Sequence, residues 1–424
     1  MLYNNYQMKN HSFIDVFAGA GGLAEGFTRN GFKPVAHIEM NKDACDTLVT
    51  RSSYYYLKSK NKLDIYRKYL KKEINRQEFL SYIPNDILKT IINETITEEN
   101  IESVFDRIRN NFEHRGDTID VLVGGPPCQA YSLVGRAVSG SRISSDPRNF
   151  LYKLYIRFLK EFKPKVFVFE NVQGLLSANS GLYLSSLKDS IRKAGYVMSI
   201  KVLTASDYGV LQNRKRIIII GIRNDLKQES LYPEKVSFAN KYYVRDVLSD
   251  LPSLAASESG SAYLTKPTEY CLKTGIRDNN DILTWHTKRY INAHDQFIYK
   301  LAIDNWNTKQ RRIKYTDVPE ELRTHKNQKA FLDRFKVVAS NMHESQTILA
   351  HLSKDGHYFI HPDLEQCRSI SVREAARLQS FPDSYYFEGS RGAAFTQIGN
   401  AVPPLMSSEI AKTIKKYLEE IEND

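Results

Sequence analysis

The sequence lacks long apolar runs, and none of its hydrophobic stretches approaches the roughly 18 residues that a membrane-spanning helix needs. Cysteine is scarce. Cys45, Cys128, Cys271 and Cys367 lie far apart, with no close pair to indicate a zinc site or a disulfide framework. The first residues, MLYNNYQMKNHS, also lack the basic-then-apolar order of a secretory signal. These absences predict a cytoplasmic protein with reduced thiols, no membrane span and no metal.

Positive charge is in excess. The chain has 60 lysines and arginines against 49 acidic residues, a net charge of +11, and a pI near 9.2. This balance favours a polyanionic partner, nucleic acid first, although many basic proteins bind none. With 424 residues, 42% of them hydrophobic, the chain can bury a sizeable core and form two or three domains.

Short apolar runs in the first half of the chain indicate buried β-strands. They are continuous and β-branched rather than alternating, as in parallel strands covered on both faces. Between these runs, residues 151–162 and 184–191 carry apolar side chains at helical spacing, which predicts two helices. The second of them ends at Gly195. This alternation predicts a doubly wound, mostly parallel α/β sheet with ligands at the carboxyl ends of its strands. The predicted strands are 12–18, 33–40, 119–125, 165–172, 197–205 and 216–223.

Two stretches interrupt the alternation. Residues 52–115 are rich in lysine and tyrosine and favour helix; a solvated helical face is the main interpretation and contact with nucleic-acid phosphate the alternative. Residues 226–367 mix polar, aromatic and basic residues with turn signals, which indicates a second, smaller domain of irregular structure. Within it, SKDGHYFIHPD predicts a β-hairpin with His357 and His361 on one face. Their spacing to Cys367 fits no standard metal site.

The chain becomes helical again after residue 368. Ser371 and Glu374 have the spacing of a capping box. Apolar residues at helical spacing over 406–421 predict a final helix.

A glycine-rich stretch, FAGAGGLAEGF, follows the first predicted strand. Gly19, Gly21 and Ala24 fit the G-x-G-x-x-G/A spacing, and Glu39 ends the next strand. The glycines allow a nucleotide-like ligand to approach the backbone, and the acid can accept hydrogen bonds from ribose hydroxyls. A dinucleotide, S-adenosylmethionine and a ligand-free βα turn are all compatible with this pattern.

Chemically reactive side chains follow the ends of three further strands. The stretch GGPPCQAYS places Cys128 after two prolines; buried cysteines are often inert, but a thiolate at the ligand edge can attack a carbon electrophile. FENV places Glu170 there, where burial would raise its pKa and let it act as an acid or hydrogen-bond donor. QNRKR adds Arg214 and Arg216, which can bind an electron-rich oxygen or a phosphate. Singly, Glu170 or Arg216 would more often form a salt bridge; together they indicate an active site.

Six segments in order, DVFAGAGG, GGPPCQAYS, ENV, QNRKR, RSISVREAARLQSFP and QIGNAVPP, resemble the ordered motifs of DNA (cytosine-5) methyltransferases of bacterial restriction–modification systems. The resemblance spans residues 12–50, 119–223 and 368–424, about half of the chain. The Pro-Pro-Cys-Gln run combined with Gln-Ile-Gly-Asn-Ala-Val makes the resemblance highly specific.

The resemblance implies a mechanism. The Cys128 thiolate would add to carbon 6 of a flipped-out cytosine, and carbon 5 would then take the sulfonium methyl group of S-adenosylmethionine. Glu170 would hold and protonate ring nitrogen 3. Arg216, with help from Arg214, would bind the carbonyl oxygen of the base. Loss of the carbon-5 proton and of the cysteine would release the product.

The resemblance also implies contacts to the cofactor. Phe17 would lie against the adenine and Glu39 on the ribose, and Asn400 and Val402 would return from the C-terminal segment. The acid that contacts the adenine amine in the family has no clean counterpart, and Glu94 in INETI comes closest. The other expected contacts are Ala18, Gly19, Gly21, Gly22, Leu23, Met40 and Pro127.

The implied organisation is a Rossmann-like cofactor-binding and catalytic domain at 1–225, a target-recognition domain at 226–367, and a segment at 368–424 that returns to the catalytic domain. The loop at 135–149, after the nucleophile, would close over DNA. The expected partner is double-stranded DNA, the expected oligomeric state is a monomer, and the expected location is the nucleoid. A cognate restriction endonuclease that acts on the same site without contacting the methyltransferase is common in the family.

Other functions explain fewer of the motifs. A nicotinamide-dependent dehydrogenase shares the glycine turn but not the thiol, the acid and the arginines on successive strand ends. Amino-methylating DNA enzymes need no nucleophile after the two prolines. A tRNA cytosine-5 methyltransferase stays an alternative, although the large basic second domain favours duplex DNA. An inactive DNA-binding relative would lack Cys128 or Glu170, and both are present. One sequence does not reveal which DNA sequence is recognised.

Overall fold

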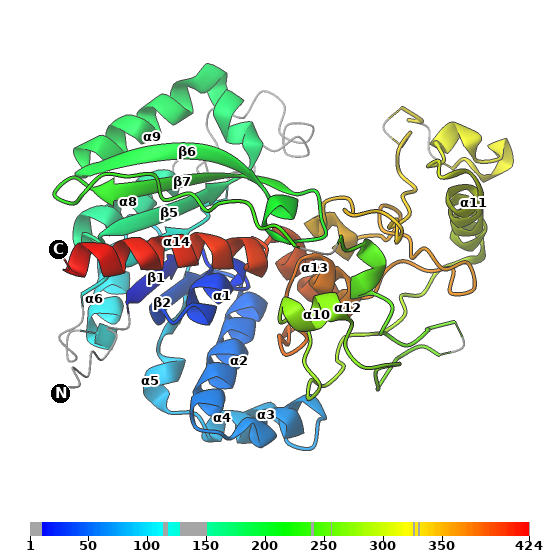
Figure 1. The fold of residues 1–424 in the computed structure, drawn as a ribbon, viewed down its shortest axis with the longest axis horizontal. Coiled ribbons are helices and arrows are strands. Elements are labelled where there is room, and N and C mark those ends of the chain that lie inside the picture. The colour runs from blue at the N-terminus through cyan, green and yellow to red at the C-terminus, as the bar shows by residue number, and fades with distance from the viewer. Residues whose placement is uncertain are drawn as a thin grey trace.

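The computed structural model describes residues 11–112, 118–127, 151–238, 241–255, 257–324, 327–329 and 331–423. A seven-stranded sheet with helices on both faces forms one half, and a more irregular half extends from it towards α11 (Ala293–Lys309) (Figure 1). The strand order is β3-β2-β1-β4-β5-β7-β6. The strands are β1 (Ser12–Val16), β2 (Lys33–Glu39), β3 (Ile91–Asn93), β4 (Val121–Gly124), β5 (Val166–Asn171), β6 (Tyr196–Thr204) and β7 (Lys215–Arg223).

The sheet is parallel from β3 to β5, whereas β7 runs antiparallel to both β5 and β6. The doubly wound, mostly parallel α/β architecture predicted from the sequence is therefore confirmed, and all six predicted strands are present. The reversal of β7 has a consequence for the site. Its first residues lie at the edge where β5 ends, with Asn171 opposite Ile217 and Glu170 opposite Ile218.

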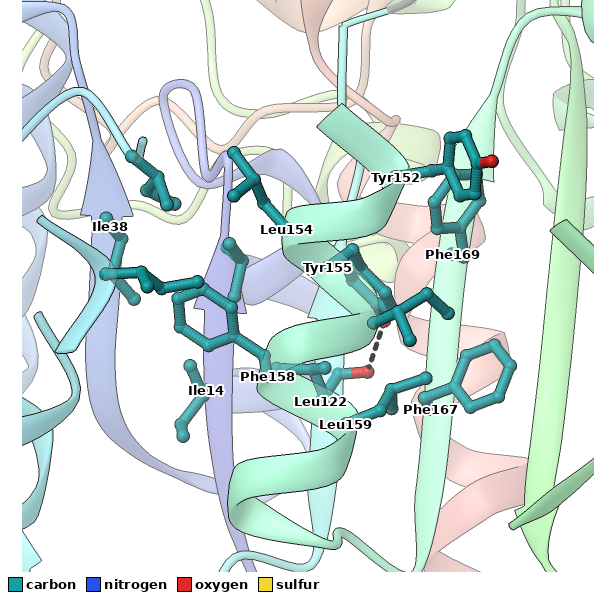
Figure 2. Packing of buried hydrophobic residues seen from close by; sticks show 14 of the residues in the cluster. Ile14, Ile38, Leu122, Tyr152, Leu154, Tyr155, Phe158, Leu159, Phe167 and Phe169 are labelled. Carbon is teal, nitrogen blue, oxygen red and sulfur yellow. Dashed lines mark hydrogen bonds between the residues drawn. The ribbon is translucent and has the colours of Figure 1, made fainter. Parts of the chain in front are cut away.

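Two hydrophobic cores hold the sheet between helices. On one face, α1 (Gly22–Arg29) and α14 (Pro404–Asn423) pack against β1, β4, β5 and β7. The other face is covered by α6 (Ile101–Phe112), α8 (Leu151–Phe162) and α9 (Leu182–Lys193). The apolar face of α8 points at the strands, and the hydroxyl of Tyr155 donates to the carbonyl oxygen of Leu122 at 3.1 Å (Figure 2). The same hydroxyl lies 3.1 Å from the carbonyl oxygen of Val168, which shares its proton. Tyr155 thus fixes α8 across β4 and β5, the two strands that carry the cysteine and glutamate motifs.

The helical insertion is shorter than the predicted 52–115. After α2 (Lys42–Ser59) come α3 (Leu63–Leu70), α4 (Arg76–Ser81) and α5 (Asn85–Leu88), and the chain then re-enters the sheet as β3. The predicted boundary was wrong because β3 has three residues, too few for a periodic signal. The insertion has its own small core around Tyr66 and Phe79. It also docks on the segment before α13, since Tyr66 donates to Ser384 O and Arg76 pairs with Glu388.

In its described residues the second half contains α10 (Glu269–Lys273), α11 and four short 3₁₀ helices, in keeping with the irregular structure predicted. The predicted hairpin at 353–363 is wrong, because Ile360 makes only isolated bridges, to Val337 and Ser369. The Asp355 carboxylate is bound by Arg334 and His351, and Gly356 packs against Ser369, so tertiary contacts take the place of the turn. Among the described residues, His357, His361 and Cys367 do not converge into a group of potential metal ligands.

The C-terminal segment forms α12 (Val372–Leu378), α13 (Arg391–Asn400) and α14, and the predicted capping box and final helix are confirmed. The backbone nitrogen of Ser371 donates to Glu374 at 2.6 Å, and Glu374 N donates back to the Ser371 hydroxyl. Arg368 binds the same carboxylate with both terminal nitrogens, each at 2.7 Å. No helix in the described parts of the chain is long and apolar enough to cross a membrane.

His361 is expected to make the fold sensitive to mild acid. Burial lowers its pKa to about 4, with Glu374, Arg368, Asp363 and His286 as its charged or titratable neighbours. An unfolded histidine titrates near pH 6.5, so protons bind the unfolded chain more readily, and stability falls as the pH drops from about 6.5 towards 4. Between neutral pH and about 4.5 the wild type should lose roughly 2–3 kcal/mol more unfolding free energy than His361→Asn.

Urea unfolding at several pH values measures this difference. His343→Asn, at an exposed position, serves as the control and should follow the wild type. Identical pH dependence in the wild type and in His361→Asn would contradict the prediction.

Candidate active site

The carboxyl ends of β1, β2, β4 and β5 and the amino end of β7 meet at one edge of the sheet. A tight loop follows β1 there, closed by hydrogen bonds from Ala18 N to Ile38 O and from Gly21 N to Ala18 O. Phe17, Gly19 and Gly21 all have left-handed φ values, of 58°, 55° and 78°. For a non-glycine residue this costs roughly 1–2 kcal/mol, so the strain at Phe17 is held by the surrounding structure.

The carboxylate of Glu39 braces this loop. It accepts hydrogen bonds from Gly19 N and from Asn41 N, both at 2.8 Å, and burial raises the pKa of Glu39. Met40, beside it, is 64% exposed. Glu94 directly follows β3, and its backbone nitrogen donates to Glu39 O, so the structure brings Glu94 to the same edge as the predicted ribose contact.

The C-terminal segment returns to the start of α1, next to this loop. A Cβ on Gly22 would overlap the carbonyl oxygen of Val402 and lie 2.8 Å from the Cβ of Ala401. Leu23 and Val402 are buried in the same core. Asn400, at the end of α13, is exposed. The cofactor contacts predicted near the start of the chain and those predicted in the C-terminal segment therefore lie together at the amino end of α1.

Replacing Gly22 by alanine is expected to disturb this contact, because backbone atoms on the other side cannot move aside cheaply. The unfolding free energy should fall by about 1–3 kcal/mol, the cost of overpacking. The dissociation constant for S-adenosylmethionine, the cofactor that the sequence predicts for this loop, should rise about tenfold or more, which corresponds to a loss of about 1.4 kcal/mol. Calorimetric titration and thermal melting measure the two effects.

Gly392→Ala is the matched control. It lies in α13, where a Cβ would meet nothing closer than Ser390 Oγ at 3.8 Å. A glycine-to-alanine change there should be neutral or stabilising. Equal behaviour of the two variants would contradict the steric argument.

Glu170 and Arg216 form an ion pair at the junction of β5 and β7. Arg216 Nε donates to Glu170 Oε1 at 2.8 Å, and both side chains are 13% exposed. A Cβ on Gly125 would lie 2.7 Å from Glu170 Oε2, so only glycine leaves room for the carboxylate. Burial raises the pKa of Glu170, and Arg216 and Arg214 oppose the rise.

Asn171 is a site residue to which the sequence assigned no role. Its side-chain nitrogen donates to Pro126 O at 3.1 Å, and the side chain is nearly buried. Asn171 therefore ties the end of β5 to the Pro-Pro turn that precedes Cys128. In the sequence, the only indication of this role was that Asn171 directly follows Glu170 at the end of the predicted strand. Cys128 and the loop at 135–149 lie outside the described residues, and Pro127 is the last described residue before them.

Arg214 is placed differently from its predicted role. The side chain is fully buried, and its terminal nitrogens donate to Ile348 O at 2.8 Å and Gly399 O at 3.0 Å. Burial, reinforced by Arg216, lowers the pKa of Arg214 well below its usual range. The guanidinium is thus engaged with main-chain carbonyls, and the contact with the base predicted for it would require a rearrangement.

The sequence model of the C-5 cytosine-specific DNA methylase family matches residues 11–82 and 66–416, which includes the glycine loop, the Glu170–Arg216 pair and most of the C-terminal segment. The chain belongs to this family. The recognition from the ordered motifs is thereby confirmed, and the protein is an enzyme of the DNA methylase class.

Named relatives agree with the family assignment. The methylase is 41% identical over 445 residues to the type II methyltransferase M.Bpa9945I of Bacillus paralicheniformis, with 96% of this chain and 98% of the relative covered. It is 30% identical to the type II methyltransferase M.AgeI of Thalassovita gelatinovora, over 95% of this chain and 98% of that one.

Solved structures share the fold of the methylase. A putative DNA modification methyltransferase encoded within a prophage of E. coli superposes with a TM-score of 0.65 at 22% identity, covering 98% of this chain and all of the other. The S. pombe Dnmt2 methyltransferase gives a TM-score of 0.55 at 14% identity, over 97% and 99% of the two chains. At these identities the likeness establishes the common fold.

Proposed function

We propose that this methylase transfers the methyl group of S-adenosylmethionine to carbon 5 of a flipped-out cytosine within a specific short sequence of duplex DNA, through a covalent Cys128 adduct at carbon 6. The observation that carries the proposal is the largely buried Glu170–Arg216 pair beside Pro126 and Pro127, which directly precede Cys128 in the sequence. Activation of a cytosine ring requires an acid, a cation and a nucleophilic thiol, and the sequence supplies these as Glu170, Arg216 and Cys128.

The raised pKa of Glu170 supports its role as the acid. A carboxyl group that holds its proton nearer neutral pH can donate to ring nitrogen 3, and this makes carbon 6 more electrophilic. Arg216 orients that carboxyl group and supplies positive charge for the carbonyl oxygen of the base, where negative charge develops.

The covalent steps follow from this arrangement. The Cys128 thiolate would form a bond to carbon 6, and the electron pair would move to carbon 5. Carbon 5 would then take the methyl group as the sulfur–methyl bond of the donor breaks and S-adenosylhomocysteine leaves. A base then removes the carbon-5 proton, the carbon–sulfur bond breaks, and the thiolate leaves. Extrusion of the base is required because these atoms are inaccessible inside a stacked duplex.

The glycine loop fits an adenosine-bearing cofactor. A Cβ on Gly19 would meet nothing within 4 Å, so the space beside this backbone is open to a ligand. Glu39 and Phe17 would hold the ribose and the adenine, and Asn400 and Val402 would cover the cofactor from the C-terminal side. Bound S-adenosylmethionine supplies the activated methyl group. The remaining proposed contacts are Ala18, Gly21, Gly22, Leu23, Met40 and Pro127.

The biological setting proposed is a restriction–modification system. The relatives are named type II methyltransferases, and a methylase of this kind protects DNA from an endonuclease with the same recognition site. The excess positive charge of +11 suits duplex DNA as the substrate. The enzyme is proposed to act as a monomer, in the cytoplasm with the nucleoid.

Bisulfite sequencing of unmethylated plasmid DNA tests the proposal. After incubation with the wild-type protein and S-adenosylmethionine, cytosines within one short motif should be protected, and omission of S-adenosylmethionine should remove the protection. Absence of protected cytosines on DNA, combined with methylation of tRNA, would overturn the proposed substrate. Absence of both would overturn the proposed reaction.

A further inference from the structure

Residues 211–214, directly before β7, contact three segments that are remote in the sequence. The backbone of Ser345 bridges to this stretch, with Ser345 N donating to Leu211 O at 3.0 Å and Asn213 N donating to Ser345 O at 2.9 Å. The Thr347 hydroxyl donates to Asn213 O. The segment at 345–349, part of the predicted target-recognition domain, is thus attached to the turn that carries Arg214 and leads to Arg216.

Gln212 adds a second set of bonds from a fully buried side chain. Its oxygen accepts from Ile348 N at 2.9 Å, and its nitrogen donates to Gln379 Oε1 at 2.6 Å and to Leu378 O at 2.9 Å. Gln379 in turn donates to Ala401 O at 2.6 Å. The chain of bonds therefore runs from Ile348 to the residue that packs on Gly22.

Arg214 completes the junction. It holds Ile348 O and Gly399 O at once, so Ile348 is bound through both its N–H and its carbonyl. A Cβ on Gly399 would overlap the backbone nitrogen of Ala350, which shows how closely α13 meets this segment. Among the residues that the structure describes, Arg214 Nε has no hydrogen-bond partner and no carboxylate accepts from this guanidinium. Burial of a charged guanidinium against neutral carbonyl groups costs folding free energy. An arginine at position 214 therefore needs a functional advantage that offsets this cost.

We infer that Gln212 and Arg214 are positioning residues that lock the segment 345–349 to the Glu170–Arg216 pair and to the cofactor-covering turn 399–402. The inference rests on the proposed function. The side chain of Leu349, 41% exposed beside the clamped Ile348, and that of Thr347 are then held at a fixed distance from Arg216. When the segment 345–349 binds DNA, its fixed position determines where the extruded base lies relative to the Glu170–Arg216 pair. Arg214 therefore acts by holding Arg216 and this segment in place, and does not contact the base.

Two substitutions at Arg214 separate geometry from charge. Arg214→Met removes the donors and keeps the volume, whereas Arg214→Lys keeps the charge but cannot bridge two carbonyls. Because a displacement of about 1 Å can cost 10²-fold in rate, Arg214→Met should lower kcat about 100-fold and Arg214→Lys should recover only a small part. The dissociation constant for S-adenosylmethionine should also rise in both, by up to about tenfold, because Gly399 O belongs to the turn at 399–402 that is proposed to cover the cofactor.

The comparison with Arg216→Met distinguishes positioning from contact with the base. Arg216→Met should lose kcat while it binds target DNA like the wild type. Arg214→Met should also bind target DNA about tenfold more weakly and lose the fluorescence increase of a 2-aminopurine placed at the target base, because the recognition segment is no longer held in register. Gln212→Met, which cuts the same junction from the other side, should behave like Arg214→Met and provides the test if Arg214→Met does not fold.

Arg223→Met is the matched control on the same strand. Arg223 lies at the opposite end of β7 and pairs with Asp225 at the surface. It should methylate, bind and flip like the wild type. Full recovery of kcat in Arg214→Lys, or wild-type DNA binding in both Arg214→Met and Gln212→Met, would overturn the inference. Methylation of DNA by the wild-type protein tests the proposed function separately. If the wild type does not methylate DNA, the proposed function is refuted, whatever the variants do.

Discussion

Replacing Cys128 by alanine is expected to reduce methyl transfer by roughly four to six orders of magnitude, the scale on which loss of a catalytic nucleophile acts. Carbon 5 of cytosine is not nucleophilic enough to take a methyl group directly, so without the adduct at carbon 6 the remaining groups have no activated carbon to present to the methyl donor. Transfer of a radiolabelled methyl group to plasmid DNA measures the effect. Binding of S-adenosylmethionine should be unaffected.

A second cysteine provides the control for this prediction. Cys271 is fully buried, and burial raises its pKa to about 12, so its thiol is inert. Cys271→Ala should retain activity. With 5-fluorocytosine at the target position, the wild type and Cys271→Ala should form a complex that survives denaturation, because fluorine at carbon 5 blocks the elimination step. Cys128→Ala should form none, and appreciable turnover by that variant would refute the covalent route.

Replacing Glu170 by glutamine is expected to lower kcat by about 10²–10⁴-fold, the usual contribution of general acid catalysis. Glutamine can still accept the bond from Arg216 Nε, so the geometry of the pair is largely kept. Glutamine cannot protonate ring nitrogen 3. Because the proposed reaction requires the acid form of Glu170, wild-type kcat should fall as the pH rises through its raised pKa. The Glu170→Gln variant should lose this decline, which a kcat–pH profile on saturating DNA records.

Stability measurements separate this loss from unfolding. A raised carboxyl pKa means that the folded state favours the protonated form, so the ionised form costs stability as the pH rises through that pKa. The neutral glutamine should therefore leave the unfolding free energy at neutral pH unchanged or higher. Glu102→Gln, at an exposed position paired with Arg157, is the control and should affect neither property. A Glu170→Gln variant with the wild-type pH profile would rule out the acid role.

The elements that the sequence predicted well are those whose signal is local. Continuous apolar runs predicted the buried strands because a strand covered on both faces has few polar residues, and the edge strand β6, which is partly exposed, was found from its β-branched residues. The apolar spacing of α8 and the capping box of α12 were equally readable. The three-residue β3 has no period to detect, and the Asp355–Gly356 turn signal was outweighed by contacts to Arg334 and Ser369, which lie elsewhere in the chain.

The sequence by itself determined the family through its ordered motifs, and from the thiol, the acid and the two arginines in those motifs it predicted the chemistry. What it could not decide is which arginine meets the substrate. Arg214 and Arg216 are two residues apart and share one side of an extended chain. Arg216 pairs with Glu170 at the edge of the sheet, whereas Arg214 is enclosed by carbonyls 134 and 185 residues away. Only the packing of the second half of the chain against the start of β7 gives the two arginines different surroundings, and no local pattern encodes contacts over that distance.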